Sequence, residues 1–119
     1  MKEIDIFVRP NDISKVIDII QRHKIGVAFF DVQGSGRASR STSEVVHSYQ
    51  TGRTVTPKFI ERTLVVSIVP DSIVKVVVED ILNSFDKQEE SSGMLFVKDV
   101  LDAYELGTKK SGEEILFSK

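Results

Sequence analysis

The chain has 119 residues, is 40% hydrophobic and 29% charged, and carries a net charge of −2 at pH 7. That length predicts one domain, residues 1–119, with a real hydrophobic core, and the slightly acidic balance argues against a general nucleic-acid binder. Without cysteine, disulfides and thiolate metal sites are excluded. The sequence begins without a signal-peptide pattern and has no apolar run near the roughly 18 residues of a membrane span, so we expect a cytoplasmic location without membrane insertion.

The first quarter of the chain predicts a strand, a helix and a second strand. Over residues 3–9, Ile4, Ile6 and Val8 alternate with Asp5, Phe7 and Arg9, which is the period of a half-buried strand, and the following proline ends it. Asn11 or Asp12 can then cap a helix, because apolar residues recur after them at 3.6-residue spacing. This helix should end within residues 23–26, and residues 26–33 predict the second strand.

A long polar segment, residues 34–62, separates the second strand from the third. A hairpin connection usually needs only about two to five residues, so an insert of this length in a compact domain indicates a functional or mobile loop. The segment is rich in Gly, Ser and Thr and poor in large apolar residues. We therefore predict that residues 38–58 are disordered or held only by packing.

The next part of the chain repeats this order of elements. Residues 63–69 predict a buried β-branched strand, after which Asp71 or Ser72 can cap a second helix. The residues expected on the inner side of this helix are Ile73, Val76, Val77, Ile81 and Phe85. Residues 86–93 then predict a polar turn, and residues 94–97 predict a short apolar strand.

The two halves of the chain match each other at a constant offset. Four positions of the first half, all at the start of its helix, recur in the second: Pro10, Ile13, Lys15 and Val16 as Pro70, Ile73, Lys75 and Val76. This repeat indicates a duplicated β-α-β unit and hence an α+β, ferredoxin-like βαββαβ sandwich. Both lysines are expected to be solvated. Residues 98–119 add one helical turn, a basic turn at Lys109 and Lys110, and a final short strand at residues 115–117.

Such a fold places both helices on one face of a four-stranded antiparallel sheet. The strands of this chain carry apolar residues on both faces, since Phe7 opposes Ile6 and Val8, and Phe29 adjoins Phe30. A monomer would expose the second apolar face, so we expect a homo-oligomer that buries it. A monomer with an apolar open face is the alternative.

Four stretches of the sequence, in this order and spacing, resemble the PII signal-transduction proteins. These stretches are IDIFVRP at residues 4–10, FDVQGSGR at 30–37, VVSIVPDSIV at 65–74 and GMLFV at 93–97. They are similar, respectively, to the opening strand with its proline, the V-x-G-x-G-R entry to the T-loop, the strand and Pro-Asp before the second helix, and the strand that follows the B-loop. The resemblance covers nearly the full chain.

The resemblance implies a homotrimer that binds an adenine nucleotide (ATP, ADP or AMP) between subunits. Members of the family are switches rather than catalysts, so no catalytic residue is expected. Here the T-loop corresponds to residues 34–62, the B-loop to residues 86–93 and the C-terminal segment to residues 105–119. Residues 38–58 would contact a protein partner, either a transporter or an enzyme of nitrogen metabolism.

The resemblance also implies which residues line the nucleotide site. They are Gly34, Gly36, Arg37, Arg62, Gly93, Lys109 and Lys110. Glycine backbone lets a phosphate approach closely, and Arg37 can pair with it. Arg62 replaces the lysine that the family carries at the far end of the loop, and it keeps the charge. The two C-terminal lysines would reach a phosphate across a subunit boundary.

The sequence departs from the family pattern at three places. Ala38 stands where the family has a Gln that helps hold Mg and 2-oxoglutarate, and a methyl group cannot ligate magnesium. The B-loop retains only Gly93 and contains Glu89 and Glu90, which would repel phosphates. The C-terminal motif is matched loosely by TKKSGE. We therefore predict that Mg-dependent 2-oxoglutarate binding is lost and that nucleotide binding is weakened or altered.

Two residues of the long loop are candidates for covalent modification. Tyr49 lies near the position of a modified tyrosine in some PII proteins, and Ser48 precedes it in an accessible Ser-rich stretch. An unmodified exposed tyrosine is the alternative. His23 and His47 have no metal partner at helical or hairpin spacing, so no metal site is predicted.

Other functions compete with the regulatory one. A structural adaptor of the same fold without a ligand would be consistent with Ala38, Met94 and the acidic B-loop. An enzyme such as an acylphosphatase would need a nucleophile or a water-activating Asn beside the loop arginine, and the loop entry has none. RNA binding through the sheet would need an aromatic stacking pattern that the strands lack.

Overall fold

Strand β1 (Lys2–Val8) places Ile4, Ile6 and Val8 on one side, where they are buried, as expected. On the opposite side Phe7 is partly buried, and Asp5 is buried as well, which the alternation did not predict. It lies inside a four-stranded sheet, between β5 (Ile60–Val69) and β6 (Gly93–Asp99). The structure is a computed structural model that describes residues 1–34, 46–47, 54–55, 60–85 and 91–117.

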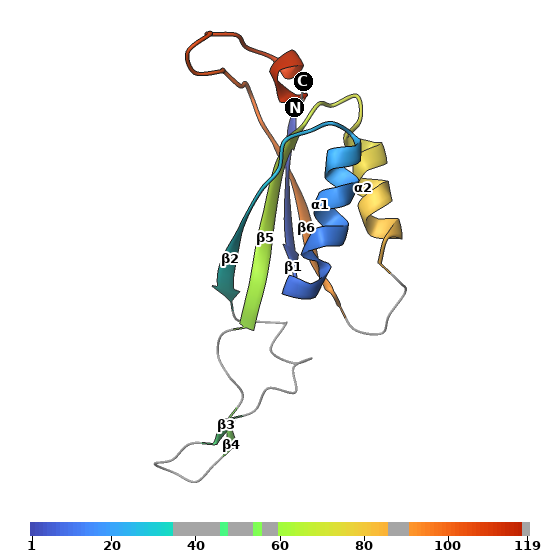
Figure 1. Cartoon of the computed structure of the whole chain (residues 1–119), viewed down its shortest axis with the longest axis vertical. Helices are drawn as coiled ribbons and strands as arrows, with labels where there is room; N and C mark the ends of the chain where they lie inside the picture. Colours follow the sequence, from blue (N-terminus) through green and yellow to red (C-terminus); the bar gives the residue numbers. More distant parts are fainter. Residues whose placement is uncertain (35–45, 48–53, 56–59, 86–90, 118–119) are drawn as a thin grey trace.

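The chain order of the main elements is that of the predicted βαββαβ sandwich. Besides β1, β5 and β6, these elements are α1 (Ile13–Arg22), β2 (Ala28–Gly34) and α2 (Val74–Asn83). The strand order is β2-β5-β1-β6 and all neighbouring pairs are antiparallel. Both helices lie side by side on one face of the sheet (Figure 1). The α+β, ferredoxin-like fold is therefore confirmed.

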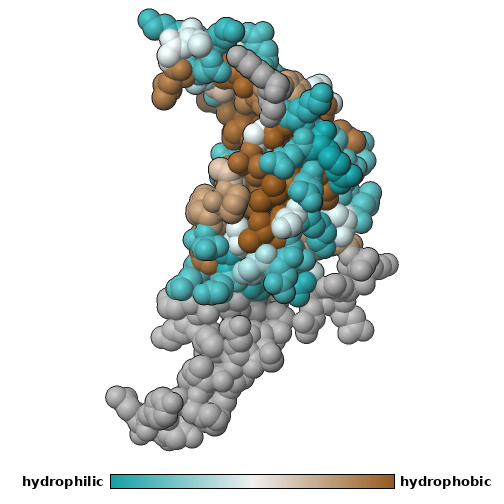
Figure 2. Space-filling model, in the orientation of Figure 1, coloured by the Kyte–Doolittle hydropathy of each residue, from teal (hydrophilic) through white to brown (hydrophobic). Residues whose placement is uncertain are grey.

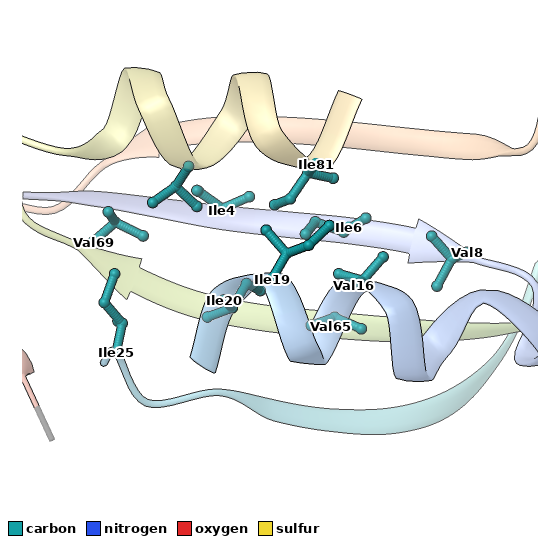
Figure 3. Close-up of a cluster of buried hydrophobic side chains, with 11 residues drawn as sticks. Ile4, Ile6, Val8, Val16, Ile19, Ile20, Ile25, Val65, Val69 and Ile81 are labelled. Atoms are coloured by element: carbon teal, nitrogen blue, oxygen red, sulfur yellow. The ribbon is translucent and has the colours of Figure 1, made fainter. Parts of the chain in front are cut away.

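The hydrophobic core fills the space between the sheet and the two helices (Figure 3). Val16, Ile19 and Ile20 of α1 point at the strands because they recur at helical spacing on one side of that helix. The rest of the core comes from the other elements: Ile4, Ile6, Val8, Ile25, Val65, Val69, Val77 and Ile81. Apolar side chains are also exposed over the middle of the molecule, beside the hydrophilic outer surface of the helices (Figure 2).

Neither helix begins with the side-chain cap expected from the sequence. A short 3-10 turn, η1 (Pro10–Asp12), precedes α1, and Asp12 makes no capping bond. Its carboxylate instead contacts Arg9 Nε at 3.3 Å and Lys15 Nζ at 3.6 Å. Helix α2 begins only at Val74, and no side chain caps it.

The inner side of α2 differs from the prediction at one residue. Val77 and Ile81, four residues apart, are buried, while Ile73 and Phe85 pack partly against the core. Val76 is 43% exposed, so its predicted inward position is wrong. One residue corresponds to about 100° around a helix, which turns Val76 away from the sheet when Val77 faces it.

The C-terminal segment also differs from the prediction. The final strand expected at residues 115–117 is wrong, because Glu113–Leu116 forms a 3-10 turn (η3) and only Phe117 pairs, as an isolated bridge to Ile25. The basic turn is present: the Glu105 amide donates to the Lys110 carbonyl at 2.7 Å, and Lys109 adopts φ 63°.

The long loop contains one described piece of structure. Strands β3 (Val46–His47) and β4 (Thr54–Val55) pair antiparallel. For these four residues the expectation of a disordered loop is wrong. The predicted loop bounds of 34–62 are also too wide, because Gly34 belongs to β2 and residues 60–62 belong to β5; the other loop residues lie outside the described part. Within the described ranges, no helix is long and apolar enough to cross a membrane.

Candidate functional site

The strand ends that border both loops implied for ligand binding, those of β2, β5 and β6, lie at the same end of the sheet (Figure 1). In β1, Val8 pairs with Thr63 on one side and with Gly93 on the other. At the outer edge, Gly34 at the end of β2 pairs with Ile60 at the start of β5. The antiparallel register therefore brings the ends of the long loop and the end of the B-loop to one edge of the sheet, which we call the loop end.

Gly93 is required at this end by backbone packing. Its φ is +151°, and a Cβ built there would lie 1.9 Å from the carbonyl oxygen of Phe7. The Ser91 hydroxyl lies 3.2 Å from the Gly93 amide and 2.9 Å from its carbonyl oxygen. The close approach of β6 to β1 thus explains this glycine without a ligand, and its predicted nucleotide role stays a prediction.

Two arginines flank the paired residues at the loop end. The side chain of Arg62 is partly buried and donates through Nη1 to its neighbour's carbonyl, that of Glu61, at 2.8 Å. Arg9, which the sequence analysis did not single out, follows Val8 and has Nη2 3.4 Å from Ser92 Oγ. The sequence feature that could have pointed to Arg9 is the Arg-Pro pair directly after the first strand. Together the two guanidinium groups can attract an anion.

A pocket of about 270 Å³ opens beside Gly93, between the end of α2 and the sheet. Apolar side chains and two serines form its lining: Ile6, Val8, Ile81, Leu82, Phe85, Ser91, Ser92, Gly93, Met94 and Leu95. No charged residue is among them, so any phosphate contact at the loop end must come from other residues, such as Arg9 and Arg62.

The two predicted C-terminal lysines lie far from the loop end. Strand β6 begins at Gly93 and ends at Asp99, which pairs with Lys2 at the opposite end of the sheet. Lys109 and Lys110 follow from there. Seven residues of strand span about 20 Å. One chain therefore brings Gly34, Arg62 and Gly93 to one end of the sheet and leaves both lysines beyond the other.

The remaining predicted residues lie outside the described part of the chain. They are Gly36, Arg37, Ala38, Ser48 and Tyr49. Among the residues that the structure describes, no three His, Asp or Glu side chains are grouped so as to hold a metal. His23 instead contacts Asp80 at 2.8 Å and so joins the end of α1 to α2.

The sheet face turned away from the helices, which we call the open face, is largely apolar, as predicted. Phe7 and Phe96 meet edge to face with ring centroids 6.0 Å apart. Phe30 is 50% exposed, and Met94 and Phe96 are each 47% exposed. Across the strands Phe30, Leu64, Phe7 and Met94 stand in one row.

The same face carries one charged cluster. Lys98 Nζ lies 2.7 Å from Asp5 Oδ2 and 3.1 Å from Glu3 Oε2. Hydrogen bonds to Asp5 and then to Glu3 raise the pKa of Lys98 above its ordinary value. Burial acts to raise the pKa of Asp5, but its contacts with Glu3 and Lys98 outweigh burial, and the net shift is downward. The cluster therefore combines an ionised ammonium and an ionised Asp5 near neutral pH.

Comparison with known proteins agrees with these features. Residues 1–110 match the family described as "Nitrogen regulatory protein P-II". The chain is also 28% identical over 123 aligned positions, covering 98% of this chain and 99% of the relative, to the "Nitrogen fixation nifHD region GlnB-like protein 2" of Methanobacterium ivanovii. The chain belongs to the nitrogen regulatory protein P-II family, whose members are signal-transduction regulators and not enzymes.

Proposed function

We propose that this nitrogen-regulatory signal-transduction protein works as a homotrimeric switch. It binds an adenine nucleotide between subunits and regulates a partner protein through loop residues 38–58. The name of its relative, a GlnB-like protein of a nitrogen fixation region, supports a partner linked to nitrogen metabolism. A cytoplasmic location belongs to the same proposal and rests on family membership.

The observation that carries this proposal is the division of the candidate residues between two ends of the sheet. Gly34, Arg62 and Gly93 share the loop end, whereas Lys109 and Lys110 follow the far end of β6. A single chain cannot bring both groups to one phosphate. A neighbouring subunit that turns its C-terminal segment toward the loop end completes the set, and the exposed apolar open face supports such an assembly.

The chemistry of the described residues favours an anionic ligand with an apolar part. Arg9 and Arg62 provide guanidinium groups at the loop end, and Arg9 contacts Ser92 of the apolar pocket beside Gly93. An adenine nucleotide (ATP, ADP or AMP) combines a planar ring with phosphates and fits this pairing. Arg37, at the entry to the loop, is the further residue proposed to pair with phosphate.

Titration calorimetry with ATP, ADP, AMP, cyclic AMP and cyclic di-AMP tests the ligand. We expect heat from at least one adenine nucleotide, and weaker binding by both Arg37→Ala and Arg62→Met. Arg22→Ala is the matched control, because Arg22 ends α1 and is exposed. Equal affinity in all four proteins would show that neither arginine holds the phosphate.

Binding of 2-oxoglutarate is expected to be absent. Ala38 has no amide oxygen for magnesium, so Mg-ATP should not create a site for this acid. Titration of 2-oxoglutarate into protein saturated with Mg-ATP measures this directly, and Ala38→Gln is the matched gain-of-function variant. Tight binding by the unmodified chain would mean that another residue supplies the missing ligand.

The second candidate function is a structural adaptor that has lost ligand binding. Ala38 and the acidic residues Glu89 and Glu90 favour it. Absence of heat from every nucleotide, with partner binding retained, would select the adaptor. In either case, deletion of residues 40–56 should leave the trimer intact and abolish partner binding in a pull-down, and retained binding would exclude the loop as the contact surface.

A further inference from the structure

The charged cluster of Glu3, Asp5 and Lys98 lies on the open face of the sheet, which is otherwise largely apolar. Across the strands, the neighbours of Asp5 on the open face are Val66 and Phe96, so the carboxylate stands among apolar residues. Asp5 is only 9% exposed, and its Oδ1 is buried and has no hydrogen-bond partner among the described residues. The positive charge that compensates this carboxylate is that of Lys98, whose Nζ lies 2.7 Å from Asp5 Oδ2.

Lys98 reaches outward from the same cluster. Its side chain is 57% exposed, whereas those of Glu3 and Asp5 are 28% and 13% exposed. An ammonium group has three N–H donors, and its described contacts use two of them. The cluster thus offers a spare donor at its surface and an excess of carboxylate beneath it.

This combination selects a particular partner for the open face. Each copy brings two carboxylates and one ammonium to such a contact. If each Lys98 contacted only the acids of its own copy, the carboxylates of the two copies would repel each other in the desolvated interface. With the ammonium of one copy near the carboxylates of the next, the same groups become complementary. A second copy of the chain carries both signs at the same positions and so matches the cluster.

We propose that Lys98 is the polar contact that fixes register and partner choice in an open-face interface between copies of this chain, by sharing its ammonium between its own Asp5 and Glu3 and the carboxylates of a neighbouring copy. The proposal rests on the proposed homo-oligomer and adds which residue permits it. The apolar row of Phe30, Leu64, Phe7 and Met94 contributes area to the interface, while the cluster determines alignment.

Sedimentation equilibrium of the full chain, with circular dichroism as the test of folding, decides the matter. Lys98→Met keeps an apolar side chain of similar length and removes the charge. We expect at least about thirty-fold weaker self-association, as for loss of one partner of a desolvated charge pair. The matched control is Lys2→Met, because Lys2 pairs with Asp99 on the helix-covered side and should leave assembly unchanged.

A double variant separates charge from packing and from misfolding. Asp5→Asn combined with Lys98→Met removes the buried carboxylate together with its cation, and we expect it to recover most of the association. Equal weakness in the single and double variants would overturn the charge-sharing role, as would wild-type association by Lys98→Met or a comparable loss in Lys2→Met. A monomeric but folded wild-type chain would instead overturn the proposed homo-oligomer itself, and this inference with it.

Discussion

Gly93 is a position in the described structure where the backbone leaves no room for a side chain. Its positive φ and the short distance from a built Cβ to the Phe7 carbonyl both oppose any other residue. Lys15 is a second position of note, because the sequence predicted a solvated side chain there and the structure shows contacts to the end of α2. Its ammonium lies 4.0 Å from the Phe85 ring centroid and donates to the Ser84 carbonyl at 3.3 Å. Both residues act within the fold, before any ligand is considered.

Gly93→Ala should destabilise the fold by at least about 2 kcal/mol, because the new methyl group overlaps the backbone of β1 and the φ becomes strained. The free energy of unfolding from urea titration measures the loss. Gly26→Ala is the control, since no atom lies within 4 Å of a Cβ at Gly26. Similar stability of the two variants would contradict the packing role of Gly93.

Lys15→Met should lower the free energy of unfolding by about 1 kcal/mol, since it removes the cation over the Phe85 ring and the donor at the end of α2. Lys75→Met is the matched control. Lys75 occupies the corresponding position of the repeat and is exposed, so its replacement should have almost no effect. Equal losses from both variants, again by urea titration, would refute the bridging role of Lys15.

At the scale of elements, α2 shows how the sheet selects one side of a helix. Its valines are consecutive at positions 76, 77 and 78, so several rotations of the helix would bury apolar surface. The observed rotation buries Val77 and Ile81, which stand four residues apart on one side. The exposed position of Val76 follows from that choice.

Ile81→Ala should cost about 2–5 kcal/mol of unfolding free energy, because it leaves a cavity between α2 and the sheet. Val76→Ala should change it by less than about 0.5 kcal/mol, as expected for an exposed substitution. Thermal or urea unfolding of the two variants compares the two sides of the helix directly. A larger loss from Val76→Ala would mean that α2 is rotated differently from this structure.

At the scale of the whole molecule, one face of the sheet is covered by helices and the other is not. The uncovered face carries large apolar side chains at partial exposure, among them Phe30, Met94 and Phe96. Soluble monomers rarely leave a contiguous apolar face of this kind in water. We therefore expect other copies of the chain to cover this face, in the same assembly that would form the proposed nucleotide site between subunits.

Phe29 and Phe30 allow a matched test of this face. Phe30 pairs with Leu64 on the open face, whereas Phe29 pairs with the buried Val65 and lies on the helix side. Phe30→Ser should weaken self-association about ten- to hundredfold, since burial of such a side chain contributes about 1.5–3 kcal/mol. Phe29→Ser should leave the sedimentation equilibrium unchanged. Equal effects would exclude the open face as the interface.

The sequence by itself determined the order of elements, the two apolar faces of the sheet and the resemblance to the P-II family. These features depend on local periodicity, on Pro and Gly positions and on the offset between Pro10 and Pro70, all of which can be read along the chain. Arg62 and Gly93 were likewise predicted as candidate site residues from their place in matching motifs. The sequence did not predict that Gly93 lies too close to the backbone of β1 to carry a side chain.

Only the tertiary structure decided which distant residues meet. Register between strands puts Asp5 beside Phe96 and within reach of Lys98, and no periodicity contains that contact. Packing between the two helices places the predicted solvated side chain of Lys15 over the Phe85 ring. Packing of α2 against the sheet buries Val77 and leaves Val76 exposed. Each of these outcomes depends on contacts between segments far apart in the chain, whose free energy outweighs the weak local preferences from which the sequence was interpreted.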